Sequence, residues 1–214
     1  MQAVAAAVDA RPWSGVRIIK DTEPGMGCML LGVTGRNAAG KSTVVEWFEE
    51  RGWQRRSCSD AIRRWLTERG DEISRETLTE GGRTLRRRGG PGILAEMLLE
   101  QTDAAQPFIV DSIRTPEEVE AFRSRPDFLL IEVRAPPAVR WSRMQARGRT
   151  GDSTTEAEFL AQEAAEAVAT DSAGQALDAT AVLADIVIEN DAGTEALTAA
   201  LGLLLEALPD LSSA

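Results

Sequence analysis

Short apolar runs alternate with amphipathic stretches along most of the chain. The apolar runs that have the length and composition of strands are Met29–Val33, Phe108–Val110, Phe128–Val133 and Ile186–Ile188, with a weaker one at Trp53–Cys58. Runs without polar alternation indicate strands that are buried on both faces, as in parallel sheets. We therefore predict a parallel sheet, mainly five-stranded.

The stretches between these runs carry helix start and stop signals. Lys41–Arg51 is followed by a glycine, and Thr115–Glu118 has the sequence of a capping box with proline at the first helical position. Ile93–Leu99 follows a proline, and leucines at helical spacing follow Thr194. Alternating strands and helices predict an α/β fold with three layers, in which right-handed crossovers place helices on both faces of the sheet. Ligands of such folds bind at the carboxyl edge of the strands.

The two ends of the chain differ in their patterns. Residues 1–27 show no clean period and contain several glycines and prolines, so we expect a loosely ordered extension followed by one domain over residues 28–214. The alanine-rich stretch Thr155–Ala181 keeps a partial helical stripe, and we expect it to be folded.

Composition and charge exclude several classes of protein. A formal net charge of -10 argues against a general nucleic-acid binder. No apolar run reaches the length of a membrane span, and the first residues lack the basic segment of a secretion signal. The two cysteines, Cys28 and Cys58, do not form a disulfide framework in a chain of this length. We expect a cytoplasmic protein without a nucleic-acid or membrane partner.

The chain has no histidine and no tyrosine, which excludes histidine-based triads, histidine metal sites and tyrosine bases. Lysine occurs only as Lys20 and Lys41, so arginine supplies nearly all the positive charge. Catalysis must therefore use carboxylates, hydroxyls, arginine, a lysine or a metal ion.

Residues 35–42, Gly-Arg-Asn-Ala-Ala-Gly-Lys-Ser, match the GxxxxGK[ST] pattern of the Walker A phosphate loop. The pattern follows a predicted strand directly and opens a predicted helix. This setting points backbone N–H groups and the positive end of the helix dipole at phosphate oxygens. The predicted nucleotide-binding residues are Gly35, Arg36, Asn37, Ala38, Ala39, Gly40, Lys41, Ser42 and Thr43.

These residues predict ATP and Mg²⁺ as cofactors. Lys41 is expected to bridge the β- and γ-phosphates, Ser42 to ligate magnesium, and Thr43 to lie near the α-phosphate. Asp111, after the predicted strand Phe108–Val110, is a second candidate ligand of the magnesium shell. Serine, not an acidic residue, follows Asp111, so nothing adjacent activates water and transfer is favoured over hydrolysis. No Asn-Lys-x-Asp guanine motif is present, which disfavours a GTPase switch.

Two later segments resemble the adenylate kinases. Ser57–Arg63 is similar to their Gly-Asp-x-x-Arg segment at Asp60 and Arg63, and Asp111–Thr115 is similar to their Asp-Gly-Phe-Pro-Arg segment at Asp111 and Arg114. Serine replaces the usual glycine after Asp111. The resemblance implies that Asp60, Arg63 and Arg114 bind the acceptor and that Asp60 takes part in catalysis.

Further segments extend the resemblance to about Met29–Leu208. Arg143–Arg149 looks like the adenylate kinase lid, and Ala184–Asn190 is similar to the last strand of dephospho-CoA kinases. Gly89–Ala95 and Arg147–Asp152 most resemble a nucleotide-kinase-like P-loop group that is found alone in archaea and fused to some bacterial deoxycytidylate deaminases. The resemblance implies a P-loop nucleotide kinase with a helical lid and acceptor region. It assigns the lid arginines as follows: Arg143 to the nucleotide, Arg147 and Arg149 to catalysis.

The chemistry of arginine agrees with these assignments. Planar guanidinium groups hold a phosphoryl group in transfer better than ammonium groups do. Arg143 and Arg147 are four residues apart and share one helix face, whereas we expect Arg140 to lie on a solvated face. Asp60 has a second interpretation as a helix N-cap.

Other polar and aromatic clusters are interpreted as structural. We expect a solvated surface for the run Arg83, Arg86, Arg87 and Arg88, with an acceptor contact as the alternative. Trp47, Trp65 and Trp141 are expected to pack in the core or between helices.

The sequence thus predicts ATP-dependent phosphoryl transfer to a small phosphorylated acceptor, by preference a nucleoside or deoxynucleoside monophosphate. The first alternative is dephospho-CoA kinase, although members of that family usually carry a histidine–proline motif for the acceptor. The second alternative is a nucleotide-gated binding or regulatory protein without transfer activity.

Overall fold

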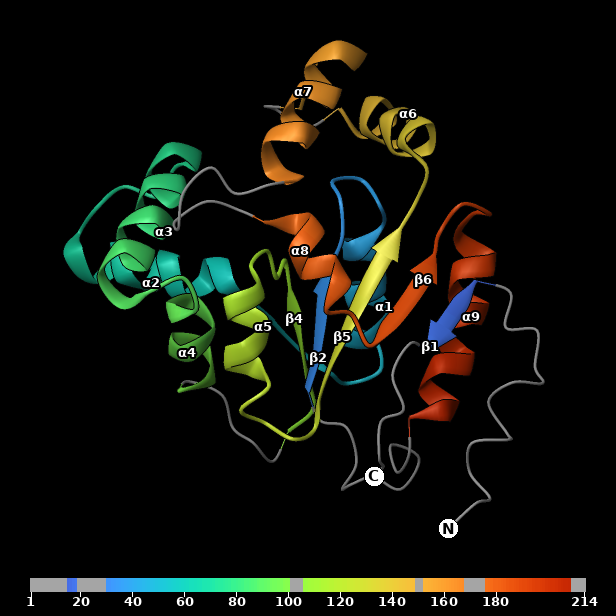
Figure 1. The fold of residues 1–214 in the computed structure, drawn as a ribbon, viewed down its shortest axis with the longest axis horizontal. Helices are drawn as coiled ribbons and strands as arrows, with labels where there is room; N and C mark the ends of the chain where they lie inside the picture. Colours follow the sequence, from blue (N-terminus) through green and yellow to red (C-terminus); the bar gives the residue numbers. More distant parts are fainter. Residues whose placement is uncertain (1–14, 19–29, 101–105, 149–151, 168–175, 209–214) are drawn as a thin grey trace.

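The computed structural model describes residues 15–18, 30–100, 106–148, 152–167 and 176–208. Over these residues the chain forms one mostly parallel sheet with helices on both faces, as Figure 1 shows. The predicted α/β class and the three-layer arrangement are confirmed.

Five parallel strands form the predicted sheet. They are β2 (Leu30–Thr34), β3 (Gln54–Ser57), β4 (Phe108–Asp111), β5 (Phe128–Arg134) and β6 (Ile186–Glu189), in the spatial order β3-β4-β2-β5-β6. The central strand β2 is buried at every position because it has helices on both sides. Its carboxyl end leads directly into the Walker A residues.

A sixth strand corrects the expectation for the N-terminal segment. Within residues 1–27, expected to be loosely ordered, β1 (Val16–Ile18) pairs antiparallel with β6, and Val16 lies opposite Ile188. Three residues are too short to show a period of two, so the sequence pattern does not reveal this strand. It forms because the outer edge of β6 offers unpaired backbone groups and because Val16 is buried there. The rest of the predicted extension lies outside the described residues.

Two core clusters occupy the two faces of the sheet. On one face, α1 (Lys41–Glu49) and α9 (Thr194–Ala207) pack against alternate strand residues such as Leu31 and Val33. The helices associated with the other face, where Leu30 points, are α2 (Cys58–Arg69), α3 (Arg75–Gly89), α4 (Ile93–Leu99), α5 (Pro116–Phe122) and α8 (Leu177–Val182). Both faces are therefore apolar, as the continuous apolar runs predicted.

Two further helices, α6 (Pro137–Arg147) and α7 (Glu156–Ala167), lie beyond the carboxyl ends of the strands (Figure 1). The rings of Trp141 on α6 and Phe159 on α7 have centroids 5.6 Å apart, so the two helices pack on each other. The alanine-rich stretch is helical in α7 and α8, and residues 168–175 lie outside the described residues. No helix in the described part of the chain is long and apolar enough to cross a membrane.

The predicted packing roles of the tryptophans agree with the structure. Trp47 is buried in the core with Phe48, and Trp65 packs against the other core cluster beneath the guanidinium of Arg69. The helix start at α5 differs in one detail from the capping box. Thr115 caps the N–H of Glu118, but the Glu118 carboxylate accepts from the N–H of Arg114 instead of Thr115.

Candidate functional site

The predicted phosphate loop connects β2 to α1 and depends on two glycines. Gly35 has a φ of 134°, and a Cβ there would lie 2.3 Å from the carbonyl oxygen of Val133. Gly40 has a φ of 107°, and a Cβ there would lie 2.1 Å from Nδ2 of Asn190. Both positions require glycine because of the left-handed backbone and the close neighbour.

Lys41 stands at the first position of α1 with its side chain folded back over the loop. Its Nζ donates to the carbonyl oxygens of Gly35 at 2.8 Å and Arg36 at 2.9 Å. Burial, and secondarily the positive charge of Arg114, lowers the pKa of Lys41 from 10.5 to about 8. A buried ammonium group whose only described hydrogen-bond partners are carbonyl oxygens is a strong site for an anion.

Arg143 of α6 and Asn190, which follows β6, form hydrogen bonds with the middle of the phosphate loop. Asn190 donates from Nδ2 to the carbonyl oxygen of Ala39 at 2.8 Å. Arg143 donates to the same carbonyl at 3.4 Å and to Oδ1 of Asn190 at 3.2 Å. The structure therefore places Arg143 at the predicted phosphate loop.

Arg147 lies one helical turn further along α6. Its guanidinium makes a two-pronged contact with Asp152, at 2.9 and 2.8 Å, and donates to Oδ1 of Asn37 at 3.0 Å. Arg147 is thus also beside the loop, although its charge is balanced by a carboxylate. Arg149 lies outside the described residues.

The candidate magnesium ligands are hydroxyl and carboxylate oxygens. Ser42 and Thr43 lie in the first turn of α1, and the Asp111 carboxylate at the end of β4 accepts from Ser112 Oγ at 2.9 Å and Arg55 at 3.3 Å. Within the described ranges no group of three or more acidic, histidine or cysteine side chains could hold a metal ion. This donor set fits Mg²⁺, which takes few protein ligands and completes its shell with phosphates and water.

Ser112 has an unusual backbone for a residue with a side chain. Its φ is 65°, in the left-handed region where the adenylate kinase segment has glycine. The hydrogen bond to Asp111 compensates part of this strain and fixes the orientation of that carboxylate.

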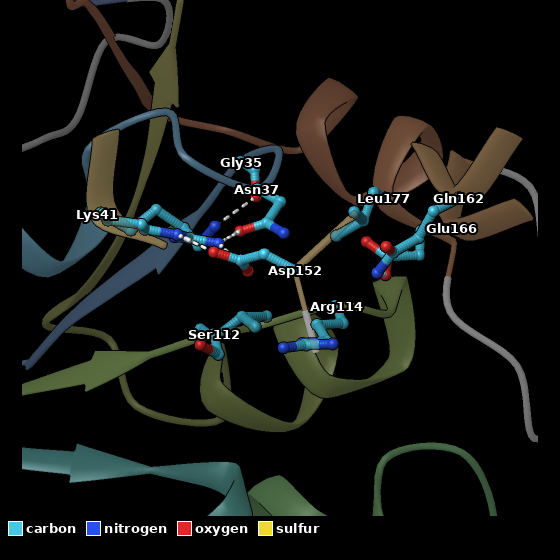
Figure 2. A pocket seen from close by; sticks show the side chains of 11 residues that line it. Gly35, Asn37, Lys41, Ser112, Arg114, Asp152, Gln162, Glu166 and Leu177 are labelled. Carbon is cyan, nitrogen blue, oxygen red and sulfur yellow. Dashed lines mark hydrogen bonds and ion pairs between the residues drawn. The ribbon is translucent and has the colours of Figure 1, made fainter. Parts of the chain in front are cut away.

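Two adjoining cavities open beside the loop. The smaller, of about 260 Å³, is lined by Gly35, Asn37, Lys41 and Arg147, and the larger, of about 730 Å³, by residues of α2, α3, α4 and α7. The residues that line both are Ser112, Arg114, Gln162 and Glu166. In Figure 2, Lys41 and Asn37 approach the smaller cavity from the loop, Arg114 from the opposite side, and Gln162 and Glu166 from α7.

The predicted acceptor residues lie in different settings. Arg63 lines the larger cavity and pairs with Asp60 at 2.8 Å, with about half of each side chain exposed. Asp60 lines neither cavity, and its carboxylate accepts from the N–H of Ser57 at 2.9 Å in the capping box of α2. The structure therefore favours the helix-capping role for Asp60. Arg114 lines both cavities, and its side chain has no partner among the described residues.

The arginine run on α3 is not uniformly solvated. Arg87 is exposed and pairs with Glu80 at 2.5 Å, in agreement with the expected surface role. Arg83 and Arg86, in contrast, line the larger cavity, and Arg86 pairs at 2.8 Å with the fully buried Glu118. Helical spacing alone does not separate these arginines, because Arg86 and Arg87 lie three and four residues after Arg83 and both spacings place residues on one face.

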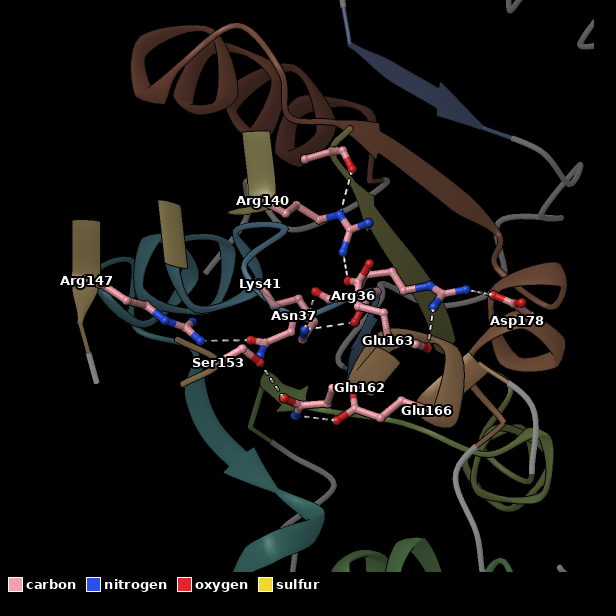
Figure 3. A network of polar contacts seen from close by, with 12 residues as sticks. Arg36, Asn37, Lys41, Arg140, Arg147, Ser153, Gln162, Glu163, Glu166 and Asp178 are labelled. Atoms are coloured by element: carbon pink, nitrogen blue, oxygen red, sulfur yellow. Dashed lines mark hydrogen bonds and ion pairs between the residues drawn. The ribbon is translucent and has the colours of Figure 1, made fainter. Parts of the chain in front are cut away.

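The expectation for Arg140 was wrong. This residue is buried and forms an ion pair with Glu163 of α7, because α7 covers the face of α6 that was expected to be solvated. Arg36 of the phosphate loop donates to the carbonyl oxygen of Glu163 at 2.9 Å and pairs with Asp178 of α8. Figure 3 shows this network, which joins the loop to α6, α7 and α8.

Sequence reasoning missed the polar residues of α7. Phe159, Glu163 and Ala167 form its buried stripe at a spacing of four, and that spacing could have identified Glu163. Gln162 and Glu166 occupy a neighbouring face, where Gln162 Nε2 donates to Glu166 at 3.0 Å.

Comparisons with known proteins agree with this fold. Residues 31–167, well over half of the chain, match the model of the AAA domain family AAA_18. A UPF0200 protein of Pyrococcus abyssi is 30% identical over 170 residues, which cover 76% of this chain and 88% of the relative. A UPF0200 protein of Thermococcus kodakarensis is 32% identical over 138 residues, which cover 61% of this chain and 75% of the relative.

Two solved structures show the same fold at low sequence identity. TT1252 from Thermus thermophilus has a TM-score of 0.53 and 20% identity, covering 86% of this chain and 99% of its own. Shikimate kinase from Acinetobacter baumannii, in complex with shikimate, has a TM-score of 0.52 and 16% identity, covering 84% of this chain and 92% of its own. The particular nucleotide-kinase-like group that the sequence resembles stays a prediction. The chain has a P-loop kinase-like fold and belongs to the AAA domain family and to the UPF0200 proteins.

Proposed function

We propose that this protein transfers a phosphoryl group from Mg-ATP to a small phosphorylated acceptor. The observation that carries the proposal is the position of Arg114 in the wall shared by two cavities. One cavity is built on the phosphate loop with Lys41, and the other is lined by Arg63, Arg83 and Arg86. Two adjoining sites for anions, with a guanidinium between them, match the requirements of transfer between two phosphate-bearing molecules.

The donor side rests on the phosphate loop. The loop N–H groups and the ammonium group of Lys41 bind and neutralise the nucleotide phosphates, and Arg143 and Arg147 reach the loop from α6. Ser42 and Asp111 are the residues that would hold Mg²⁺, which neutralises phosphate charge when bound. Asp111 has no acidic neighbour to orient water, so the residues favour transfer over hydrolysis.

The acceptor side combines charge with apolar surface. Besides its arginines, the larger cavity is lined by Ile62, Ile73, Leu78 and Leu94. Such a site suits an organic phosphate whose remainder is partly apolar, since the arginines bind the phosphate and the aliphatic side chains contact the rest. A nucleoside or deoxynucleoside monophosphate is the first candidate. A cytoplasmic setting is part of this proposal, and the free, buried Cys58 fits it.

A second candidate acceptor is favoured by Glu166. This carboxylate lines both cavities, where it repels phosphate but could accept a proton. A hydroxyl group must lose a proton as it attacks phosphorus, whereas the phosphate of a nucleoside monophosphate is already ionised. Glu166 therefore favours a phosphorylated alcohol, such as dephospho-CoA, as the alternative.

The test is to incubate the protein with Mg-ATP and each of AMP, dAMP, CMP, dCMP, UMP, GMP and dephospho-CoA, and to follow products by ³¹P NMR. A phosphoanhydride product identifies a monophosphate acceptor, and a new phosphomonoester identifies a hydroxyl acceptor. ADP that forms equally fast without any acceptor would contradict transfer in favour of an ATPase. Binding of ATP without any product would leave the nucleotide-gated regulatory role.

A further inference from the structure

We propose that Arg86 and Arg114 form the anion subsite of the larger cavity, and that the buried carboxylate of Glu118 positions both of them. This inference rests on the proposed function, because it assigns the phosphate that the acceptor already carries to these two arginines. It adds Arg86, from the run interpreted as surface, and Glu118, which has no counterpart among the predicted site residues.

Glu118 joins two elements that are distant in the sequence. The residue is 0% exposed and lies in the first turn of α5. One carboxylate oxygen accepts from Arg86 of α3 at 2.8 Å, and the other accepts from the backbone N–H of Arg114 at 2.9 Å. Each oxygen thus fixes one of the two arginines, and the positive end of the α5 dipole stabilises the carboxylate.

Arg86 reaches the cavity with an incompletely paired guanidinium group. Its side chain is 11% exposed, one terminal nitrogen is bound to Glu118, and its Nε is buried without a hydrogen-bond partner among the described residues. Buried donors are normally paired, and a guanidinium group presents five of them in one plane. The buried Nε is closed to solvent, so a ligand would meet the terminal part of this cavity-lining guanidinium group, which is already largely desolvated.

Arg114 supplies the second cation. Its guanidinium lines both cavities and, within the described ranges, makes no ion pair or hydrogen bond. Glu118 is bound to its backbone and not to its side chain, so the direction in which the side chain leaves the loop is fixed while its charge stays available. The net charge around the larger cavity is positive, because Arg63, Arg83, Arg86 and Arg114 outnumber the carboxylates of Asp60, Glu118 and Glu166, and a phosphate group would balance it.

Arg87 provides a matched control on the same helix. It follows Arg86 directly in the sequence, but it is exposed, pairs with Glu80 and does not line the cavity. Substitution of Arg87 removes the same charge from α3 without removing a group from the subsite.

The experiment measures binding of AMP and of dephospho-CoA by calorimetry, with the protein saturated by Mg²⁺ and a non-hydrolysable ATP analogue. Arg86→Gln should weaken binding of the acceptor by about tenfold or more, as expected for a lost charge-assisted hydrogen bond, with binding of the ATP analogue unchanged. Arg87→Gln should leave both affinities unchanged. Glu118→Gln should weaken binding of the acceptor but not of the ATP analogue, because Arg86 and the backbone at Arg114 lose the carboxylate that binds both of them.

A double variant separates binding from folding. Arg86→Met with Glu118→Gln removes both buried charges together, which proteins often tolerate without loss of stability, whereas removal of one partner leaves an uncompensated charge. The double variant should unfold near the temperature of the unmodified protein and still lack acceptor binding. Wild-type acceptor affinity in a folded double variant would overturn the subsite, and so would equal weakening of acceptor and ATP analogue in Arg86→Gln.

The outcomes also distinguish the subsite from the proposed function. Phosphoryl transfer that is insensitive to Arg86→Gln would disprove the subsite and leave the function standing. Acceptor binding that depends on Arg86, without transfer in any NMR assay, would disprove the function and leave the subsite. If none of the seven acceptors of the NMR assay binds to the unmodified protein, the subsite and the proposed function are both wrong.

Discussion

Asn190, directly after β6, donates a 2.8 Å hydrogen bond to the carbonyl oxygen of Ala39 in the middle of the phosphate loop. The amide group of Asn190 also fills the space that a side chain at Gly40 would need, since a Cβ there would lie 2.1 Å from Nδ2. The last parallel strand therefore determines the shape of a loop that lies much earlier in the sequence.

We expect Gly40→Ala to weaken binding of an ATP analogue by about tenfold or more, because the loop must move to relieve the clash and the left-handed backbone is strained. Calorimetry measures the affinity, and circular dichroism checks the fold. Gly52→Ala is the matched control: Gly52 also has a positive φ, of 88°, but nothing lies within 4 Å of its Cβ position. Gly52→Ala should lower the free energy of unfolding by about 1 kcal/mol and leave nucleotide affinity unchanged. Equal loss of nucleotide affinity in both variants would contradict the role of the loop shape.

Lys41→Met should lower phosphoryl transfer by about a hundredfold or more, since losing one preorganised contact to the reacting phosphates commonly costs about 3–4 kcal/mol. The same substitution should stabilise the ligand-free protein at pH 7. Burial lowers the pKa of Lys41 from 10.5 to about 8, so the charged form is disfavoured in the folded state, by up to about 3 kcal/mol. Product formation by ³¹P NMR and thermal unfolding check the two effects. A folded Lys41→Met protein with full transfer activity would remove the basis of the proposed function.

Nucleotide binding at pH 8 should be accompanied by proton uptake. In the ligand-free protein Lys41 has a pKa of about 8, and triphosphate binding favours its charged form. We expect uptake of about half a proton at pH 8 and less as the pH falls, measured by calorimetry in buffers of different ionisation enthalpy. The lowered pKa of Lys41 also makes the stability of the ligand-free protein depend on pH. The folded state binds fewer protons than the unfolded state between about pH 8 and 10.5, so the free energy of unfolding should rise with pH across this window. Equal uptake in Lys41→Met would assign the proton to another group.

Arg140→Met should destabilise the protein by about 3–5 kcal/mol, because it leaves the buried carboxylate of Glu163 without its partner. The double variant of Arg140→Met with Glu163→Gln should recover much of this loss. Chemical denaturation of the single and double variants measures the coupling. Arg64→Met is the control, because Arg64 and Glu68 form an exposed pair that contributes about 1 kcal/mol or less. A loss for Arg140→Met as small as the control would show that α7 does not depend on this pair.

The five parallel strands and the phosphate loop could be predicted from the sequence alone. Strands such as β2 and β5 are continuous apolar runs because both of their faces are covered, and the Walker A pattern fixes the loop because two of its backbone positions exclude side chains. These features are local: burial on both sides and a positive φ each constrain residues that are neighbours in the chain.

The roles of the charged residues, in contrast, depend on contacts between distant parts of the chain. Arg86 and Arg87 are adjacent arginines on one helix, yet one meets a buried carboxylate from α5 and the other meets a glutamate on its own helix. Arg140 is buried because α7 packs over α6, and Asp60 is a capping residue because it lies three residues after Ser57, the N-cap of α2. The role of a charged side chain depends on the partner it meets across the fold and on the water that this contact excludes, and neither is encoded within one turn of its own helix.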